Sequence, residues 1–97
     1  QLGIAAQTLN LTARMIGANH LKTKTGIYVF EKLADVNVSN NEIRVGDIIV
    51  EFEGKPVSSV DSMHKYLNEA TIGKKITLSV LRGGHKQEIT AVPAELN

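Results

Sequence analysis

The sequence predicts a small α+β domain that is mainly β, with about five strands and two helices. Two patterns carry this prediction. Segment 75–82 alternates apolar and polar side chains and runs into Gly83-Gly84, which is typical of a β-hairpin. Segment 58–70 repeats apolar residues at helical spacing, at Val60, Met63, Leu67 and Ala70. A length of 97 residues suits one domain with one modest core.

Shorter patterns predict the other strands. Segment 4–8 should be a strand entered from a glycine turn, and β-branched and aromatic residues favour strands at 26–33 and 48–52. Segment 85–92 should return beside 75–82, with Ile89 and either Ala91 or its neighbour facing inward. These strands account for most of the chain.

The helix ends are predicted from caps and glycines. A short helix over 12–16 should end at Gly17, a plausible C-cap. The helix at 58–70 has Ser58 or Ser59 as its N-cap, and Asp61 stands three residues after Ser58, as in a capping box. Segment 34–45 is expected to be a loop with one helical turn at most.

Composition argues against several classes of function. The net charge is near +1 and the basic residues are scattered, so nucleic acid is not an expected partner. The longest apolar runs, such as 48–50, are too short to span a membrane. The sequence has no cysteine, which excludes disulfides, thiolate metal sites and a cysteine nucleophile.

Four stretches, in this order along the chain, resemble the PDZ domain of HtrA (Deg)-type trypsin-like serine proteases. They are Gln1-Leu2-Gly3-Ile4, then Gly26-Ile27-Tyr28-Val29, then 44–49 followed by Gly54-Lys55-Pro56-Val57, and finally Leu81-Arg82-Gly83-Gly84 with Val92-Pro93-Ala94-Glu95. The family usually has an aromatic residue where Gln1 stands, and within 37–43 only Ile43 fits the family pattern well. The resemblance nevertheless covers nearly the whole chain.

The resemblance implies a PDZ-like, partly open barrel of five to six strands capped by two helices, in the permuted bacterial strand order. Residues 1–97 are then a single PDZ domain and a fragment of a larger protein. The implied function is recognition of C-terminal or unfolded, extended apolar peptide segments by strand addition. The protease domain of the same parent chain would be a second partner, and the implied location is extracytoplasmic, in the periplasm or cell envelope.

A groove of this kind needs an anion-binding turn and a strand with a free edge. Leu2, Gly3 and Ile4 are the candidates for holding the peptide carboxylate, because Gly3 can adopt a positive φ at no steric cost. The candidate strand is Ile4-Ala5-Ala6-Gln7, whose small side chains would let another backbone approach. If Gly3 merely starts a strand, the carboxylate site does not exist.

The groove also needs an apolar pocket for the last side chain of the peptide. The candidates come from the glycine loop and from the helix: Leu2, Ile4, Met63, Tyr66, Leu67 and Ala70. Met63 and Leu67 lie one turn apart, and the alternative for both is ordinary core packing, the usual role of helix residues at this spacing. Tyr66 or Ala70 would form the rim.

No catalytic centre, metal site or cofactor site is expected in these residues. Asp61, Ser62 and His64 are close in sequence, but such neighbours on a helix point in different directions and cannot form a hydrogen-bonded triad. The three histidines are far apart and lack metal-ligand spacing. The alternatives are a PDZ domain of another membrane-associated or secretion-associated protein, and a structural or oligomer-contact domain whose groove its own chain closes. A stand-alone enzyme is the least favoured.

Overall fold

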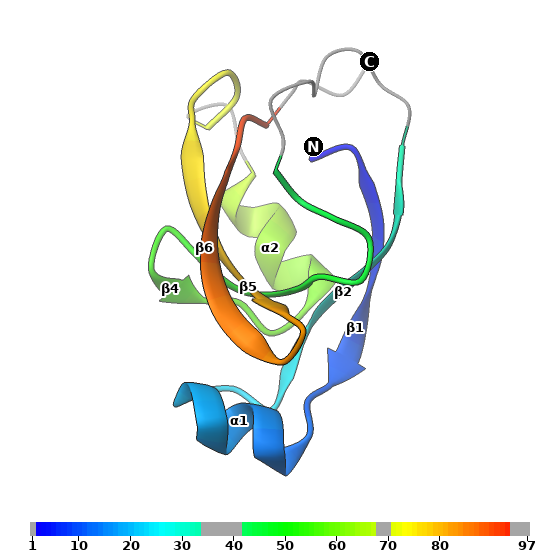
Figure 1. The fold of residues 1–97 in the computed structure, drawn as a ribbon. Coiled ribbons are helices and arrows are strands. Elements are labelled where there is room, and N and C mark those ends of the chain that lie inside the picture. Colours follow the sequence, from blue (N-terminus) through cyan, green and yellow to red (C-terminus); the bar gives the residue numbers. More distant parts are fainter. Residues whose placement is uncertain (1, 34–41, 68–70, 94–97) are drawn as a thin grey trace.

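The computed structural model describes residues 2–33, 42–67 and 71–93. Within them the chain forms six strands and two helices (Figure 1). In chain order these are β1 (Ile4–Asn10), α1 (Ala13–Asn19), β2 (Thr25–Lys32), β3 (Ile48–Phe52), β4 (Lys55–Pro56), α2 (Val60–Tyr66), β5 (Ile76–Arg82) and β6 (His85–Ala91). The predicted α+β, mainly β class is confirmed.

The strands form one open, antiparallel sheet. Its order is β1-β2-β3-β5-β6, and the two-residue β4 pairs with β3 beside this path. Strands β5 and β6 pair along their full length from Ile76–Ala91 to Arg82–His85, as the alternating pattern and the double glycine predict. Strands β1 and β6 are therefore the two ends of the described sheet.

Each face of the sheet carries its own apolar cluster. Residues Ile27, Val29, Ile49, Leu78 and Val80 pack in a larger cluster with α2. Their sequence neighbours Ile48, Val50 and Leu81 pack in a smaller cluster with α1, which lies at one end of the molecule in Figure 1. Burial on both faces explains why β3 is a continuous apolar run rather than an alternating one.

Gly26 marks a close contact between β2 and β3. A Cβ atom added there would lie 2.7 Å from Cγ2 of Ile48 and 3.3 Å from the Ile49 carbonyl oxygen. Glycine inside a strand usually signals such a close approach. The glycine that opens the predicted 26–33 strand thus lets β2 pack tightly against its neighbour.

Both helices differ from the sequence-based bounds. Helix α1 continues through Gly17 to Asn19, and His20 in the left-handed region (φ 53°) forms the C-cap. A glycine inside a helix costs only about 1 kcal/mol, so Gly17 did not have to end it. Helix α2 starts at Val60 with Ser59 as its N-cap, and the capping box pairs Ser59 with Ser62 rather than Ser58 with Asp61. It ends at Tyr66, with Leu67 as C-cap, so the predicted 58–70 span was too long.

Candidate peptide-binding groove

Strand β1 has one edge without a strand partner among the described residues, where it pairs with β2 alone. At one end of this ladder the Leu11 amide donates to the Lys24 carbonyl at 2.8 Å, and at the other the Leu33 amide donates to the Gly3 carbonyl at 2.7 Å. Bonded and non-bonded pairs alternate along an antiparallel ladder. Counting from each end, the residues of β1 whose backbone groups point away from β2 are Ile4, Ala6, Thr8 and Asn10.

A β-bulge in β2 explains why counting from either end of the ladder gives the same outward-facing residues of β1. The register passes from Ala6 opposite Val29 to Ala5 opposite Glu31, so Phe30 is the extra residue of β2. The Phe30 side chain is 48% exposed. The bulge therefore leaves β1 regular through residues 4–8, the part of the strand on which another chain could pair.

The turn that leads into β1 contains a glycine in the left-handed region. Gly3 has φ +66°, in the left-handed region that residues with a side chain adopt only with strain. The Gly3 carbonyl accepts a hydrogen bond from the Leu33 amide. Gly3 therefore has a conformational reason to be glycine beyond starting a strand.

The apolar candidates separate into buried and half-buried side chains. Leu2 and Met63 are 2% and 3% exposed and belong to the larger core cluster. Ile4 and Leu67 are half-buried and pack on the surface of that cluster. An incoming side chain would therefore meet Ile4 and Leu67 first, with Leu2 and Met63 in the core beneath. Met63 is therefore part of the core cluster, and Leu67 lies at its edge.

The Tyr66 side chain, a candidate for the rim of the pocket, contacts residues of β3 and β4. Its ring stacks on Phe52 with centroids 5.1 Å apart and planes 13° apart, and the Lys55 ammonium lies 5.8 Å from its centroid. These contacts give Tyr66 a structural role on the side of α2 next to β3. The other rim candidate, Ala70, lies outside the described residues.

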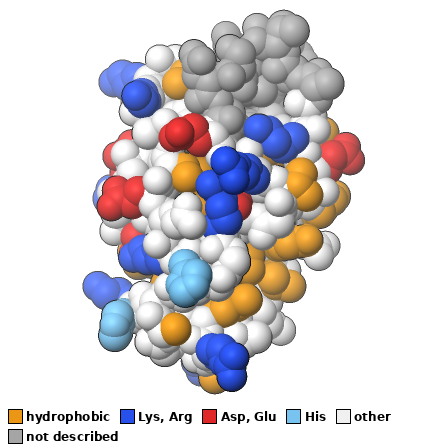
Figure 2. Space-filling model, in the orientation of Figure 1, with side chains coloured by type: hydrophobic (Ala, Val, Ile, Leu, Met, Phe, Trp, Pro, Cys, Tyr) orange, Lys and Arg blue, Asp and Glu red, His pale blue; other side chains and the backbone are white. Residues whose placement is uncertain are grey.

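Several large apolar side chains are exposed on or next to β2 and in the segment before β3. In Figure 2 hydrophobic side chains line the side of the molecule where β1 and β2 run in Figure 1. The large apolar side chains that remain exposed include Phe30 at 48%, Leu33 at 43% and Val45 at 57%. Two backbone hydrogen bonds fix the segments that carry Leu33 and Val45. The Leu33 amide donates to the Gly3 carbonyl, and the Gly46 amide donates to the Val29 carbonyl at 2.8 Å.

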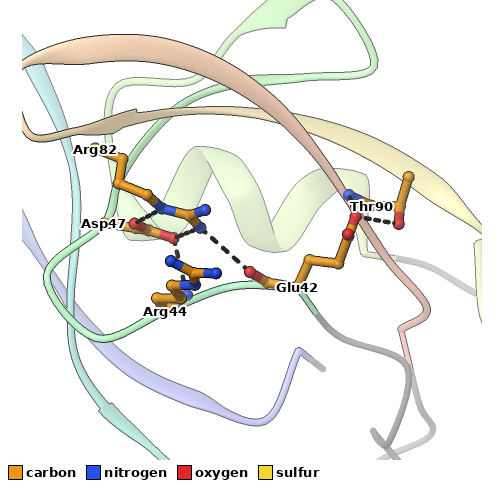
Figure 3. Close-up of polar contacts among 5 residues, drawn as sticks. All are labelled: Glu42, Arg44, Asp47, Arg82 and Thr90. Atoms are coloured by element: carbon orange, nitrogen blue, oxygen red, sulfur yellow. Dashed lines mark hydrogen bonds and ion pairs between the residues drawn. The ribbon is translucent and has the colours of Figure 1, made fainter.

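A polar cluster beside β5 was missed by the sequence analysis (Figure 3). The Asp47 carboxylate is buried and accepts from Arg82 through Nε at 2.9 Å and Nη2 at 2.7 Å. It also accepts from the Arg44 backbone amide at 2.8 Å. Hydrogen bonding by Asp47 raises the pKa of Arg82. Both partners lie in stretches that carry the PDZ resemblance, but 35 residues separate them and no local pattern links them.

Glu42 ties the same segment to β6. Its Oε1 accepts from the Thr90 backbone amide at 2.7 Å and from the Thr90 hydroxyl at 2.6 Å. The hydroxyl bond and then the amide bond hold the pKa of Glu42 below its usual range. Segment 42–47 is thus fastened to β5 and β6 by charged groups.

Asp61, Ser62 and His64, which are close in sequence and all described by the structure, form no side-chain hydrogen bond to one another. Ser62 is engaged in the capping box, where its hydroxyl accepts from the Ser59 amide at 3.1 Å. Asp61 and His64 are exposed. Among the residues that the structure describes there is no group of three potential metal ligands, and no helix there is long and apolar enough to cross a membrane.

A profile of the PDZ domain family matches residues 2–92. The chain belongs to the PDZ domain family. It is 28% identical over 89 residues to the periplasmic serine endoprotease DegP of Escherichia coli K12, covering 92% of this chain and 18% of that protein. This PDZ domain therefore spans about a fifth of the length of that relative and is homologous to the PDZ domains of HtrA-type proteases.

Two solved structures agree with this assignment. The HtrA-type protease AlgW with a decapeptide matches with a TM-score of 0.67 and 25% identity, over 95% of this chain and 28% of that one. The HtrA3 PDZ domain bound to a phage-derived ligand, FGRWV, matches in fold with a TM-score of 0.61 and 24% identity, over 97% of this chain and 82% of that one. The chain is a PDZ domain rather than a protease catalytic domain, and its named relatives are serine proteases of the HtrA type.

Proposed function

We propose that this PDZ domain binds the C-terminal tails of other polypeptides, and extended apolar segments like them, by adding a strand to β1. The observation that carries the proposal is the outer edge of β1, with α2 beside it and Gly3 at a positive φ where the strand begins. Backbone pairing supplies affinity in this mode and side-chain pockets supply specificity. Two solved relatives of the same fold carry peptides, AlgW and HtrA3.

In this proposal the residues divide into three tasks. The backbone amides of Leu2, Gly3 and Ile4 receive the terminal carboxylate, because successive amides in a turn with a left-handed residue form an anion-binding concavity. The peptide backbone pairs with the Ile4–Gln7 edge, chiefly through the outward groups of Ile4 and Ala6. The last side chain rests on Ile4 and Leu67, above Leu2 and Met63.

In the parent chain, we propose, the domain is the recognition or regulatory module of a trypsin-like serine protease that works outside the cytoplasm. The relatives named as HtrA-type proteases, and the periplasmic DegP among them, support this proposal. Its checks are hydrolysis of unfolded casein by the full-length protein and its recovery in the extracytoplasmic fraction of the source cells. Absence of both would remove the protease assignment and leave peptide binding untouched.

The binding proposal is tested with the peptide FGRWV, prepared with a free and with an amidated C-terminus. The domain has no tryptophan, so fluorescence anisotropy of the peptide tryptophan reports binding without background. A short added strand buries less than the ~1,200 Å² of a small stable interface, so we expect a dissociation constant on the order of micromolar. Amidation removes the charge that the turn would hold and should weaken binding about tenfold or more, since hydrogen bonds to charged groups contribute roughly 1.5–3 kcal/mol.

Equal affinity for the two forms would show that the Leu2-Gly3-Ile4 turn is not a carboxylate site. A matched peptide of the same composition in scrambled order, with a free C-terminus, controls for binding through charge alone.

A further inference from the structure

Strand β6 is the other end of the described sheet, where it pairs with β5 alone. Backbone groups of an edge strand point alternately toward the neighbouring strand and outward. The Lys86 and Thr90 amides donate to groups outside the described strands, so the outward-facing residues of β6 are Lys86, Glu88 and Thr90. Such an edge is a template on which another chain can pair.

Both ends of this edge are closed by hydrogen bonds to its backbone. At one end the Asn19 side-chain oxygen accepts from the Lys86 amide at 3.0 Å, and the Asn19 nitrogen donates to the Gly84 carbonyl at 3.0 Å. At the other end the Thr90 amide donates to Glu42 Oε1 at 2.7 Å, and the Thr90 carbonyl accepts from the Glu42 amide at 3.0 Å (Figure 3). The two closures lie about 13 Å apart along the strand.

The two closures differ in how firmly the fold supports them. Glu42 holds Thr90 through both its backbone and its side chain, and the next residue, Ile43, is fully buried. The Lys86 amide is held by one side chain at the end of α1, which lies next to the β5–β6 hairpin (Figure 1). None of the seven residues of α1, all of them described, is buried. Removing the Asn19 side chain therefore frees the Lys86 amide while Thr90 stays bound.

The stretch that Asn19 closes, residues 86–88, is complementary to itself. Lys86 and Glu88 are exposed, carry opposite charges and share one face of β6, because side chains two apart in a strand point the same way. When two such strands pair antiparallel about Gln87, Lys86 of each copy lies opposite Glu88 of the other. Opposite charges in facing positions stabilise a strand pair, and two-fold pairs are the commonest assembly of identical chains.

We propose that Asn19 keeps the β6 edge closed to a second copy of this domain, and that without this side chain β6 pairs with β6 of a second copy. The pairing is antiparallel and two-fold, through residues 86–88. It uses the end of the sheet that does not contain β1, so the inference does not depend on the proposed peptide binding. The role of Asn19 is then to prevent association of the domain through this edge.

The test is the mass of the domain in solution, measured by sedimentation equilibrium from about 10 µM to about 1 mM. A short strand pair buries less than the ~1,200 Å² of a small stable interface, so we expect Asn19→Ala to dimerise with a dissociation constant on the order of 100 µM. The unmodified domain should stay monomeric throughout. A monomeric Asn19→Ala domain at the highest concentration, or equal association of the unmodified domain, would overturn the proposal.

A charge reversal in the Asn19→Ala background assigns the interface. Glu88→Lys places like charges opposite each other at two positions and should weaken dimerisation about fivefold or more. The control is Glu31→Lys, the same charge change at an exposed residue of β2, which should leave the dissociation constant unchanged. Equal dissociation constants in the two variants would refute pairing through β6.

Hydrogen exchange separates strand pairing from other association. At low concentration the Lys86 amide of Asn19→Ala has lost its acceptor and should exchange faster than in the unmodified domain. In the dimer the Glu88 carbonyl of the second copy replaces that acceptor, so exchange should slow about threefold or more as the concentration rises through the dissociation constant. Association without this slowing would show that the copies meet at another surface, and the proposal would fail.

Discussion

Asp47 is the only buried charged residue among those the structure describes, and its two carboxylate oxygens are fully engaged. Arg82 binds them as a fork, and the Arg44 amide adds a third bond. The Asp47 side chain is 2% exposed and that of Arg82 is 23% exposed. A buried pair of this kind adds little compared with apolar packing, but removing one partner leaves an uncompensated charge in the interior.

We therefore expect Arg82→Met to lower the free energy of unfolding by about 2–4 kcal/mol, because it strands the Asp47 carboxylate. The matched control is Lys86→Met on the same hairpin. Lys86 pairs with Glu51 at 3.0 Å, but with 34% and 24% of the side chains exposed. That pair should be worth about 1 kcal/mol or less. Urea melts of the two variants give the comparison, and equal losses would contradict the burial argument.

At the scale of elements, one side chain joins α1 to the β5–β6 hairpin. The Asn19 amide nitrogen donates to the Gly84 carbonyl at 3.0 Å, and its oxygen accepts from the Lys86 backbone amide at 3.0 Å. The same nitrogen donates to the Met15 carbonyl, one turn earlier in α1. This bridge is the polar counterpart of the smaller apolar cluster between α1 and the sheet.

Asn19→Ala should detach the end of α1 from the hairpin at a cost of about 1 kcal/mol or somewhat more, since each net hydrogen bond contributes roughly 0.5–1.5 kcal/mol. The clearest sign is faster hydrogen exchange of the Lys86 amide, which loses its acceptor. Arg14→Ala, an exposed change in the same helix, is the control and should leave that amide protected. Unchanged exchange in Asn19→Ala would mean that the apolar contacts alone hold α1 in place.

At the scale of the whole molecule, two carboxylates link stability to pH. The pKa of Glu42 is lowered by its bonds to Thr90. Burial would raise the pKa of Glu51, but hydrogen bonds from Lys86 and Ser79 outweigh it and lower that pKa as well. A depressed pKa in the folded state means that the unfolded chain binds protons first as pH falls. The stabilisation is complete at neutral pH and is lost in acid.

The free energy of unfolding should fall as the pH drops from about 5 to about 3, through and below the ordinary glutamate value of 4.5. Replacing both residues, by Glu42→Gln and Glu51→Gln, should make this dependence shallower. Urea melts at pH 7, 5, 4 and 3 measure it, with Glu88→Gln, an exposed residue in the middle of β6, as the control. Parallel pH profiles for the domain and the double variant would exclude these two groups as the source.

The sequence by itself determined the class of fold, the principal strands and the family. Alternation along β5 and the double glycine after it specify a hairpin locally, because side-chain period and turn geometry depend on neighbouring residues alone. The positive φ of Gly3, before β1, could likewise be expected from the sequence, because this conformation depends on the residue type at one position. The resemblance added the order in which these pieces occur.

Only the tertiary structure decided how those pieces meet. Helical spacing placed Met63 and Leu67 on one face, but the packing of α2 decided that Met63 is buried and Leu67 half-buried. Asp47 and Arg82, like Thr8 and Val60, find each other across more than 30 residues of chain. Sequence periodicity predicts which face of an element a side chain occupies. The residue that it contacts depends on which distant element the fold packs against that face. For that reason the candidate residues of the groove could be named from the sequence, whereas their burial and their distant partners could not.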